Sequence, residues 1–371
     1  MKIIHRLRNK LKNTKEFYNV YTSGLNRREI EQLLKKDTLD AFSYFKGKTS
    51  IDDNAPIHAS PSSFLHGIKE IFISFVMQLT PARRLFYGIA IIAFLLGLIN
   101  YHLLYLIGSF VIFNLLLALE LANKLTTRDE LEIAREIQQS LQPFNIPESQ
   151  LLSIATFYRP ARLVGGDFFD IVQPDSDRLI SIVGDVSDKG IAAALYAAYT
   201  QSMFQSLSQT KQSPSNIFHS LNDLISRRLR EGDFITAVIA FFDLNEKSVT
   251  IARAGHSWPL YYCADTKGIT ELKTRGLSIG LVENVQFADQ LEEQKIFLNQ
   301  GDLLFLYSDG VTEATNPQDL MFDIDRLKKV IEKNVYESSE TIVDRINSQL
   351  HEFAKSDDLQ DDVTMVAFKI K

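Results

Sequence analysis

Cysteine is almost absent from the sequence, in which Cys263 is the only one among 371 residues. A single cysteine cannot form a disulfide within the chain, and it does not combine with the 7 histidines in any zinc-ligand spacing. A metal ion bound by this chain would therefore be held by carboxylates, carbonyl oxygens and water. Ligands of this kind favour magnesium, manganese or calcium over zinc or copper.

An excess of positive charge is also missing. The chain has 40 lysines and arginines against 46 aspartates and glutamates, which gives a net charge of -6. Nucleic-acid binding as a main task normally requires a basic domain, so we expect no nucleic-acid partner. Residues 1–14 are basic and amphipathic, but their apolar part is too short for an export signal. That segment could be a helix facing a membrane or a solvated end.

Charged residues are absent from one long stretch, residues 85–119. One membrane span needs about 20 apolar residues, so this stretch is too long for one helix and favours a transmembrane hairpin of two short helices. Basic residues flank it on both sides: Arg83, Arg84, Lys124 and Arg128. The positive-inside rule then puts both ends in the cytoplasm. The alternatives are a buried helical pair of a soluble domain, or a further span formed by residues 68–79.

A linker helix is predicted between this hairpin and Pro143. Thr127 is a candidate N-cap at its start, and the proline marks its end. Its apolar residues share one helix face: Leu131, Ala134, Ile137 and Leu141. This face could dock on the domain that follows, or it could pair with a second copy of the chain and form a homodimer. Two heptads are too few to indicate a coiled coil.

Four acidic sites stand at the ends of predicted strands in the rest of the chain. The clearest is Asp309, which follows the apolar run of residues 303–306 and precedes a glycine. A strand followed by Asp-Gly is also an ordinary turn, because glycine lets the backbone turn sharply. However, a similar arrangement recurs at Asp185, and acidic residues stand at strand starts at Asp167 and Asp361. Four carboxylate sites at strand ends indicate one shared metal site.

The motifs around these carboxylates occur in the order of a known family. They are Gly165-Gly-Asp-Phe-Phe-Asp170, Gly184-Asp-Val-Ser-Asp-Lys-Gly190, Phe234-Ile-Thr-Ala237, Ala254-Gly-His256, Ser308-Asp-Gly310 and Asp361-Asp-Val-Thr364. Together they resemble the metal-dependent protein serine/threonine phosphatases of the phosphatase 2C-like clan, in the branch of stage II sporulation protein E and RsbU. Residues 136–141, before Pro143, are similar to the helix that leads into the catalytic domain of that branch.

The resemblance implies a four-layer α-β-β-α sandwich, of α+β class, with two Mn²⁺ or Mg²⁺ ions at one end of the paired sheets. Asp185 would bridge both ions, and Asp309 and Asp361 would complete one of them. Asp167 and the carbonyl of Val186 would hold the other. A metal-bound water would then attack the phosphoryl group, because paired cations activate water near neutral pH and stabilise the displaced charge.

Other polar residues of the motifs have two interpretations each. Three acidic residues could touch the site through water or could be caps and solvated side chains: Asp170, Asp188 and Asp362. His256 is interpreted as stabilising a turn. Many relatives have histidine where this chain has Lys189, so the general acid that protonates the leaving oxygen is not identified. Arg162 is a candidate phosphate ligand, and a surface arginine is its alternative interpretation.

Four regions follow from these patterns. They are a cytoplasmic N-terminal region with a linker (1–84), a transmembrane helical hairpin (85–119), a linker or regulatory helix (124–143) and a phosphatase 2C-like catalytic domain (145–371). The last region alternates strands with helical pairs and is long enough to bury one core. The first region contains no recognisable sensor module.

The predicted function is that of a multi-pass protein of the cytoplasmic membrane with its catalytic domain in the cytoplasm. It would hydrolyse phosphoserine or phosphothreonine on a cytoplasmic signalling protein, which in this branch is typically an anti-sigma-factor antagonist of a partner-switching pathway. The alternative is a catalytically weak membrane scaffold that uses the same fold to bind partners. A degenerate scaffold usually loses metal ligands, and all four carboxylates are kept here. A kinase or cyclase would need a phosphate-binding glycine-rich loop that the chain lacks.

Overall fold

The computed structural model describes residues 72–143, 146–210, 213–355 and 360–371. The chain divides into two compact units, Met1–Lys124 and Leu125–Lys371, and each is described by itself. The predictions made for residues 1–71, including the basic segment at the start and the linker, lie outside the described residues.

The first unit contains an apolar helical hairpin. Helix α5 (Pro81–Asn100) ends at Tyr101, whose left-handed backbone reverses the chain, and α6 (Leu103–Leu141) follows. The two helices approach closely at Gly97, where an added Cβ would lie 2.8 Å from the side chain of Leu106. Both are long and apolar enough to cross a membrane, by length and composition, and only 11% and 6% of their most apolar windows are buried among the described residues.

Helix α6 differs from the prediction at Thr127. The sequence predicts a helix that starts there, but α6 is continuous from Leu103 to Leu141 and Thr127 lies inside it. The physical reason is that no glycine or proline interrupts residues 109–142, so nothing ends the helix before Pro143.

The second unit is built on two antiparallel sheets of five strands. The first sheet has the order β1 (Leu152–Arg159), β10 (Val363–Ile370), β9 (Leu303–Tyr307), β6 (Leu260–Cys263) and β7 (Gly268–Glu271). The second has the order β2 (Phe168–Val172), β3 (Arg178–Val186), β4 (Ile235–Asp243), β5 (Ser248–Ala254) and β8 (Glu293–Phe297).

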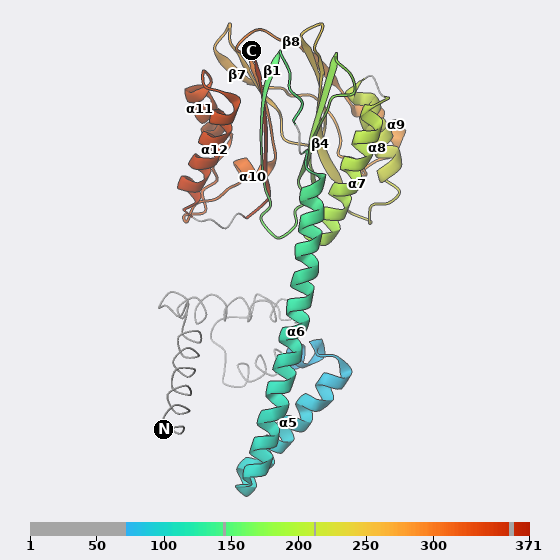
Figure 1. The fold of residues 1–371 in the computed structure, drawn as a ribbon. Coiled ribbons are helices and arrows are strands. Elements are labelled where there is room, and N and C mark those ends of the chain that lie inside the picture. Colours follow the sequence, from blue (N-terminus) through green and yellow to red (C-terminus); the bar gives the residue numbers. More distant parts are fainter. Residues whose placement is uncertain (1–71, 144–145, 211–212, 356–359) are drawn as a thin grey trace, which may run out of the picture. The chain divides into compact units, whose positions relative to one another are not determined.

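Helices cover the outer face of each sheet, as Figure 1 shows. Helices α11 (Ile324–Asn334) and α12 (Ser339–Ala354) pack on the first sheet, and α7 (Ile191–Ser208) and α8 (Pro214–Ile225) pack on the second. The short helices α9 (Asn284–Gln290) and α10 (Asp309–Thr312) complete the unit. This is the α-β-β-α sandwich that the sequence predicts.

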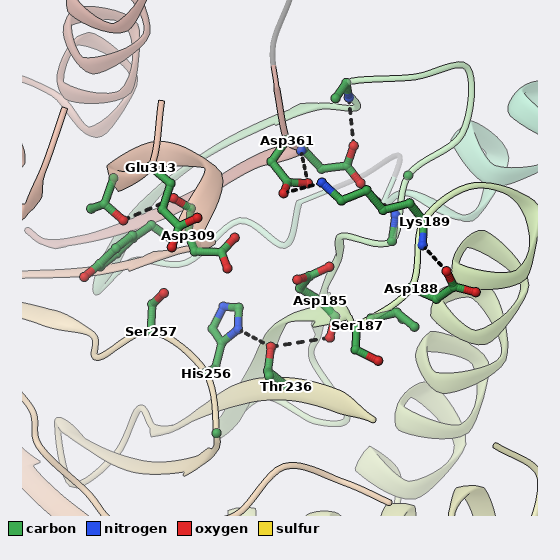
Figure 2. A pocket seen from close by; sticks show the side chains of 18 of the residues that line it. Asp185, Ser187, Asp188, Lys189, Thr236, His256, Ser257, Asp309, Glu313 and Asp361 are labelled. Atoms are coloured by element: carbon green, nitrogen blue, oxygen red, sulfur yellow. Dashed lines mark hydrogen bonds and ion pairs between the residues drawn. The ribbon is translucent and has the colours of Figure 1, made fainter. Parts of the chain in front are cut away.

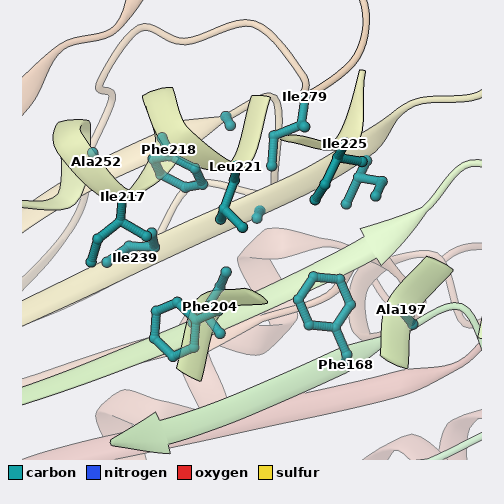
Figure 3. Packing of buried hydrophobic residues seen from close by; sticks show 14 of the residues in the cluster. Phe168, Ala197, Phe204, Ile217, Phe218, Leu221, Ile225, Ile239, Ala252 and Ile279 are labelled. Atoms are coloured by element: carbon teal, nitrogen blue, oxygen red, sulfur yellow. The ribbon is translucent and has the colours of Figure 1, made fainter. Parts of the chain in front are cut away.

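Strand β4 is buried on both faces, which accounts for its unbroken run of apolar residues. Ala237, Ile239 and Phe241 pack toward α7 and α8 in the cluster that Figure 3 shows in part. The alternate residues Val238 and Phe242 pack between the two sheets, where Phe242 lies 4.8 Å from Phe368, measured between ring centroids. Both faces of the strand are therefore buried, and an alternation of polar and apolar residues is not expected.

Candidate metal centre

Strand pairing brings the predicted carboxylates to one end of the sandwich. In the second sheet Phe168 pairs with Gly184, so Asp167 just before β2 lies beside Asp185 near the end of β3. In the first sheet Tyr307 pairs with Met365. Asp309 follows β9 and Asp361 precedes β10, so both lie at the same end of these paired strands.

A recess of about 940 Å³ opens at this end of the unit. Asp185, Val186, Asp309 and Asp361 all line it, and Figure 2 shows the three carboxylates pointing toward its centre. The structure thus brings together four of the five residues that the sequence predicts as metal ligands.

Asp167 is the fifth, and it lies behind the wall of the recess. Its side chain is buried, and its Oδ2 accepts a hydrogen bond of 2.6 Å from the hydroxyl of Thr364. Burial raises the pKa of Asp167 well above its usual range, and the nearby charges of Asp185 and Asp362 raise it further. Thr364 belongs to the last of the family motifs, but its contact with Asp167 is not predicted from the sequence.

The carboxylates of the recess shift one another's pKa values. Burial raises the pKa of Asp185 to about 7, and repulsion from Asp309 and Asp361 adds to the shift. Burial also raises the pKa of Asp309, with contributions from Glu313 and Asp361. Like charges held this close favour either protonation or a bound cation.

Gly166 lies against the oxygens that would bind a metal ion. An added Cβ there would lie 3.1 Å from the carbonyl oxygen of Val186 and 3.2 Å from Oδ1 of Asp185, so the glycine faces two of the predicted ligand oxygens. Within the described ranges, no three acidic, histidine or cysteine side chains are already grouped to hold an ion. Asp167 is instead bonded to Thr364, and Asp361 to Lys189. The donor set therefore fits a hard divalent cation in its chemistry and is not a preformed cage.

Asp362 holds the loop that carries Asp167. Its Oδ1 accepts from the backbone N–H of Ala161 at 2.7 Å, and its Oδ2 accepts from that of Gly166 at 2.7 Å. Its own backbone approaches Gly310 so closely that a Cβ on this glycine would collide with the Asp362 carbonyl. Gly310 lies inside α10 and has no left-handed backbone, so its role is close packing and not the sharp turn that the sequence predicts.

The other two acidic residues of the motifs lie apart from the centre of the recess. Asp170 is buried and accepts a hydrogen bond of 2.8 Å from Gln205 of α7. Asp188 lies on the rim, 3.9 Å from Arg230. Arg162 lines the same rim as an exposed side chain.

Lys189 pairs with one of the predicted ligands. Its Nζ lies 2.7 Å from Oδ2 of Asp361, and both side chains are about half exposed. The hydrogen bond to Asp361 raises the pKa of Lys189, so the ammonium stays charged. Lys189 therefore supplies a cation to the recess and is a poor proton donor near neutral pH.

His256 lines the recess and is hydrogen-bonded to Thr236 beside it. Its Nδ1 lies 2.9 Å from the Thr236 hydroxyl, which in turn donates to the backbone oxygen of Asp185 at 3.4 Å (Figure 2). Burial lowers the pKa of His256 to about 3, and the charge of Arg253 lowers it further. The imidazole is therefore neutral in the folded protein.

Gln138 is a site residue that the sequence prediction missed. Its side-chain amide makes two hydrogen bonds with the backbone of Gly165, within the second unit. Three residues of the predicted apolar face are half-buried, namely Leu131, Ala134 and Leu141, whereas Ile137 is 58% exposed and the buried residue beside it is Gln138. The helical period of 3.6 residues fits the set 131, 134, 138 and 141 as well as it fits the predicted set, which has 137 in place of 138. The apolar pattern could not identify a buried glutamine.

A family model described as stage II sporulation protein E (SpoIIE) matches residues 175–371. Phosphoserine phosphatase RsbU of Bacillus subtilis (strain 168) is 29% identical to this chain over 244 residues, which are 66% of this chain and 71% of the relative. Phosphoserine phosphatase RsbP of the same strain is 26% identical over 239 residues, which are 63% of this chain and 57% of the relative.

Two solved structures have the same fold. The SiaA-PP2C domain of Pseudomonas aeruginosa has a TM-score of 0.59 at 19% identity, over 67% of this chain and 98% of that one. The PP2C phosphatase domain of SpoIIE from Bacillus subtilis, solved with a fragment of its regulatory domain, has a TM-score of 0.52 at 18% identity, over 60% of this chain and 64% of that one. These similarities confirm the predicted phosphatase 2C-like sandwich. Because the family match covers more than half of its residues, the chain belongs to the stage II sporulation protein E family.

Proposed function

We propose that this chain is a membrane-anchored, metal-dependent protein serine/threonine phosphatase. The observation that carries the proposal is the convergence of Asp185, Asp309 and Asp361 on one recess from two different sheets. Relatives named phosphoserine phosphatases support the enzyme class. The alternative of a catalytically weak scaffold is disfavoured because every predicted carboxylate is present at the site.

The residues of the recess have separate roles in such a reaction. Two Mn²⁺ or Mg²⁺ ions, when bound, would activate water and balance charge on the transferred phosphoryl group. Asp185, Asp309 and Asp361 would hold them together with the Val186 carbonyl. Asp167 would contribute from the wall, where Thr364 fixes its carboxylate.

The proposed substrate is a phosphorylated cytoplasmic signalling protein. RsbU and RsbP carry the name phosphoserine phosphatase, which supports phosphoserine as the reacting group. The resemblance to this branch further favours an anti-sigma-factor antagonist and a partner-switching pathway. Arg162, an exposed cation on the rim, is the candidate ligand for the incoming phosphate.

The proposed location is the cytoplasmic membrane, with α5 and the apolar first part of α6 as its two spans. Their length and composition support this, and the basic flanks favour a cytoplasmic catalytic domain. A homodimer through the linker helix is also proposed. Ile133 and Ile137 are each 58% exposed, and they are four residues apart on one helix face.

The experiment is phosphate release from a phosphoserine peptide by the full chain in detergent, with and without Mn²⁺. Asp185→Asn and Asp309→Asn should each reduce turnover by about a hundredfold or more, since each removes a carboxylate that would hold the cations whose charge stabilises the transition state. Asp289→Asn is the matched control, because Asp289 is an exposed aspartate outside the recess. Near-normal turnover by a folded Asp185→Asn protein with metal in excess would reject the metal-centre assignment.

A further inference from the structure

Trp258 is the only tryptophan of the chain, and it is 40% exposed. It lies in the loop between β5 and β6, two residues after His256. Its side chain lines the same recess as Asp185 and Asp309. A large aromatic side chain at the mouth of a reaction site is costly to leave in water and is a frequent anchor of protein recognition.

Two cations hold the indole in place. The Arg253 guanidinium lies 5.8 Å from the ring centroid, and Lys273 Nζ lies 4.7 Å from it. Arg253 is itself fixed, because it donates to the carbonyl oxygens of Thr274 at 3.0 Å and His256 at 2.9 Å. Cation–π contacts of this kind orient the ring before a ligand binds. The side chain therefore loses little conformational entropy on binding.

Met321 adds a second apolar side chain to the same recess. It is 55% exposed, and it belongs to the loop between α10 and α11. The loop is pinned by the β-bridge between Thr315 and Met321 and by the buried side chain of Phe322. Methionine adapts its shape to different apolar partners, whereas the held tryptophan offers a rigid surface.

The charges around the recess limit what can bind beside these two side chains. Glu313 and Asp188 also line it and would repel an acidic residue of the substrate. Of the cations that line it, Lys189 is paired with Asp361, and Arg162 is the candidate ligand for the phosphate itself. Lys273 is paired with Glu271 at 3.4 Å, and Arg253 is committed to backbone carbonyls. An uncharged apolar side chain therefore has the smallest desolvation cost on entering the recess and buries the most apolar surface there.

We propose that Trp258 and Met321 form a docking rim for an apolar residue, such as leucine or methionine, adjacent to the phosphoserine of the substrate protein. This inference rests on the proposed phosphatase function and assigns a substrate preference to the same site. The rim is continuous with the recess in which the carboxylates lie, so the occupant is part of the molecule that carries the phosphate.

The test compares two synthetic phosphoserine peptides that differ only in the residues flanking phosphoserine, which are leucine in one and serine in the other. The full chain in detergent with saturating Mn²⁺ should prefer the leucine peptide by about tenfold in kcat/KM, mainly through KM, as burial of one apolar side chain allows. Trp258→Ala should bring this ratio close to one, and Trp258→Phe should keep most of it.

Two further variants complete the design. Met321→Ser should also reduce the ratio, and it tests the inference if Trp258→Ala fails to fold. Phe297→Ala is the matched control, because Phe297 is an exposed aromatic residue that faces Lys295 at 5.7 Å and does not line the recess. It should leave the ratio as in the wild type.

The outcomes separate the inference from the function on which it rests. Equal use of both peptides by the wild type, or a ratio that survives in both Trp258→Ala and Met321→Ser, overturns the docking rim and leaves the phosphatase assignment standing. An equal loss on both peptides in Trp258→Ala would make Trp258 a structural residue and also overturns it. Hydrolysis of neither peptide by the wild type overturns the phosphatase function and the rim together.

Discussion

Gln138 and Gly165 are joined by a reciprocal pair of hydrogen bonds. The Gln138 amide donates to the Gly165 carbonyl at 2.8 Å, and its oxygen accepts from the Gly165 N–H at 3.1 Å. A primary amide can do both, whereas a carboxylate can only accept and methionine makes neither bond well. The end of the linker helix is therefore fixed to the loop that leads into Asp167.

Breaking this pair should weaken metal binding. Gln138→Met should reduce turnover several-fold and raise the Mn²⁺ concentration needed for half-maximal activity, because a shift of about 1 Å in a positioned group can cost on the order of a hundredfold in rate. The measurement is a Mn²⁺ titration of activity on the full chain, together with its melting temperature. Gln139→Met is the control, since Gln139 is the exposed neighbour. A lower melting temperature with unchanged turnover per folded molecule would make the helix a spacer only.

Removal of Lys189 should have the opposite effect on metal affinity. Its ammonium pairs with Asp361, so it competes with a cation for that carboxylate. Lys189→Met is expected to lower the half-saturating Mn²⁺ concentration by about two- to tenfold, with a reduced dependence on salt. Calorimetric titration with Mn²⁺ measures this directly, and Lys329→Met provides a control at an exposed position of α11. Weaker metal binding in Lys189→Met would instead assign the lysine a supporting role.

Much of the fold was predictable because both faces of its strands are buried, which leaves long apolar runs in the sequence. Asp185 and Asp309 were predictable as site residues for a related reason, since each interrupts or ends such a run. The pairing of Lys189 with Asp361 was not predictable, because the two residues meet only when the sheets pack. Gln138 was missed because amphipathic periodicity places apolar residues inward and gives no weight to a buried amide.

The acid sensitivity of the protein should depend on His256. Its pKa is about 3 in the folded protein, below the ordinary value of 6.5, so the unfolded chain takes up the proton first as the pH falls. His256 therefore costs stability below pH 6.5, by about 1.4 kcal/mol for each pH unit until the folded pKa is reached. The melting temperature of His256→Gln should thus fall less steeply than that of the wild type between pH 6.5 and pH 4.

The control for this prediction is His219→Gln, at a partly exposed position of α8. It should follow the wild-type slope. Equal slopes for His256→Gln and the wild type would show that the imidazole is not held neutral in the fold.

The predicted topology can be tested with cysteine reporters. Cys263 is first replaced by alanine, because it is the only native cysteine. Cysteines placed at Ser63 and at Glu136, on either side of the apolar helices, should both be protected from a membrane-impermeant reagent in intact cells. Labelling of only one position would require an odd number of spans.

Strand β10 lies between β1 and β9, although it is the last of these strands in chain order. During synthesis on a ribosome, β1 therefore emerges long before the strand that pairs with it, as the register of Leu152 with Ile370 makes plain. The first sheet lacks its second strand until β10 has left the exit tunnel. Asp361 emerges only just before that strand. Until β10 has emerged, the chain should therefore carry no phosphatase activity, and the unpaired strands would be targets for chaperones during that interval.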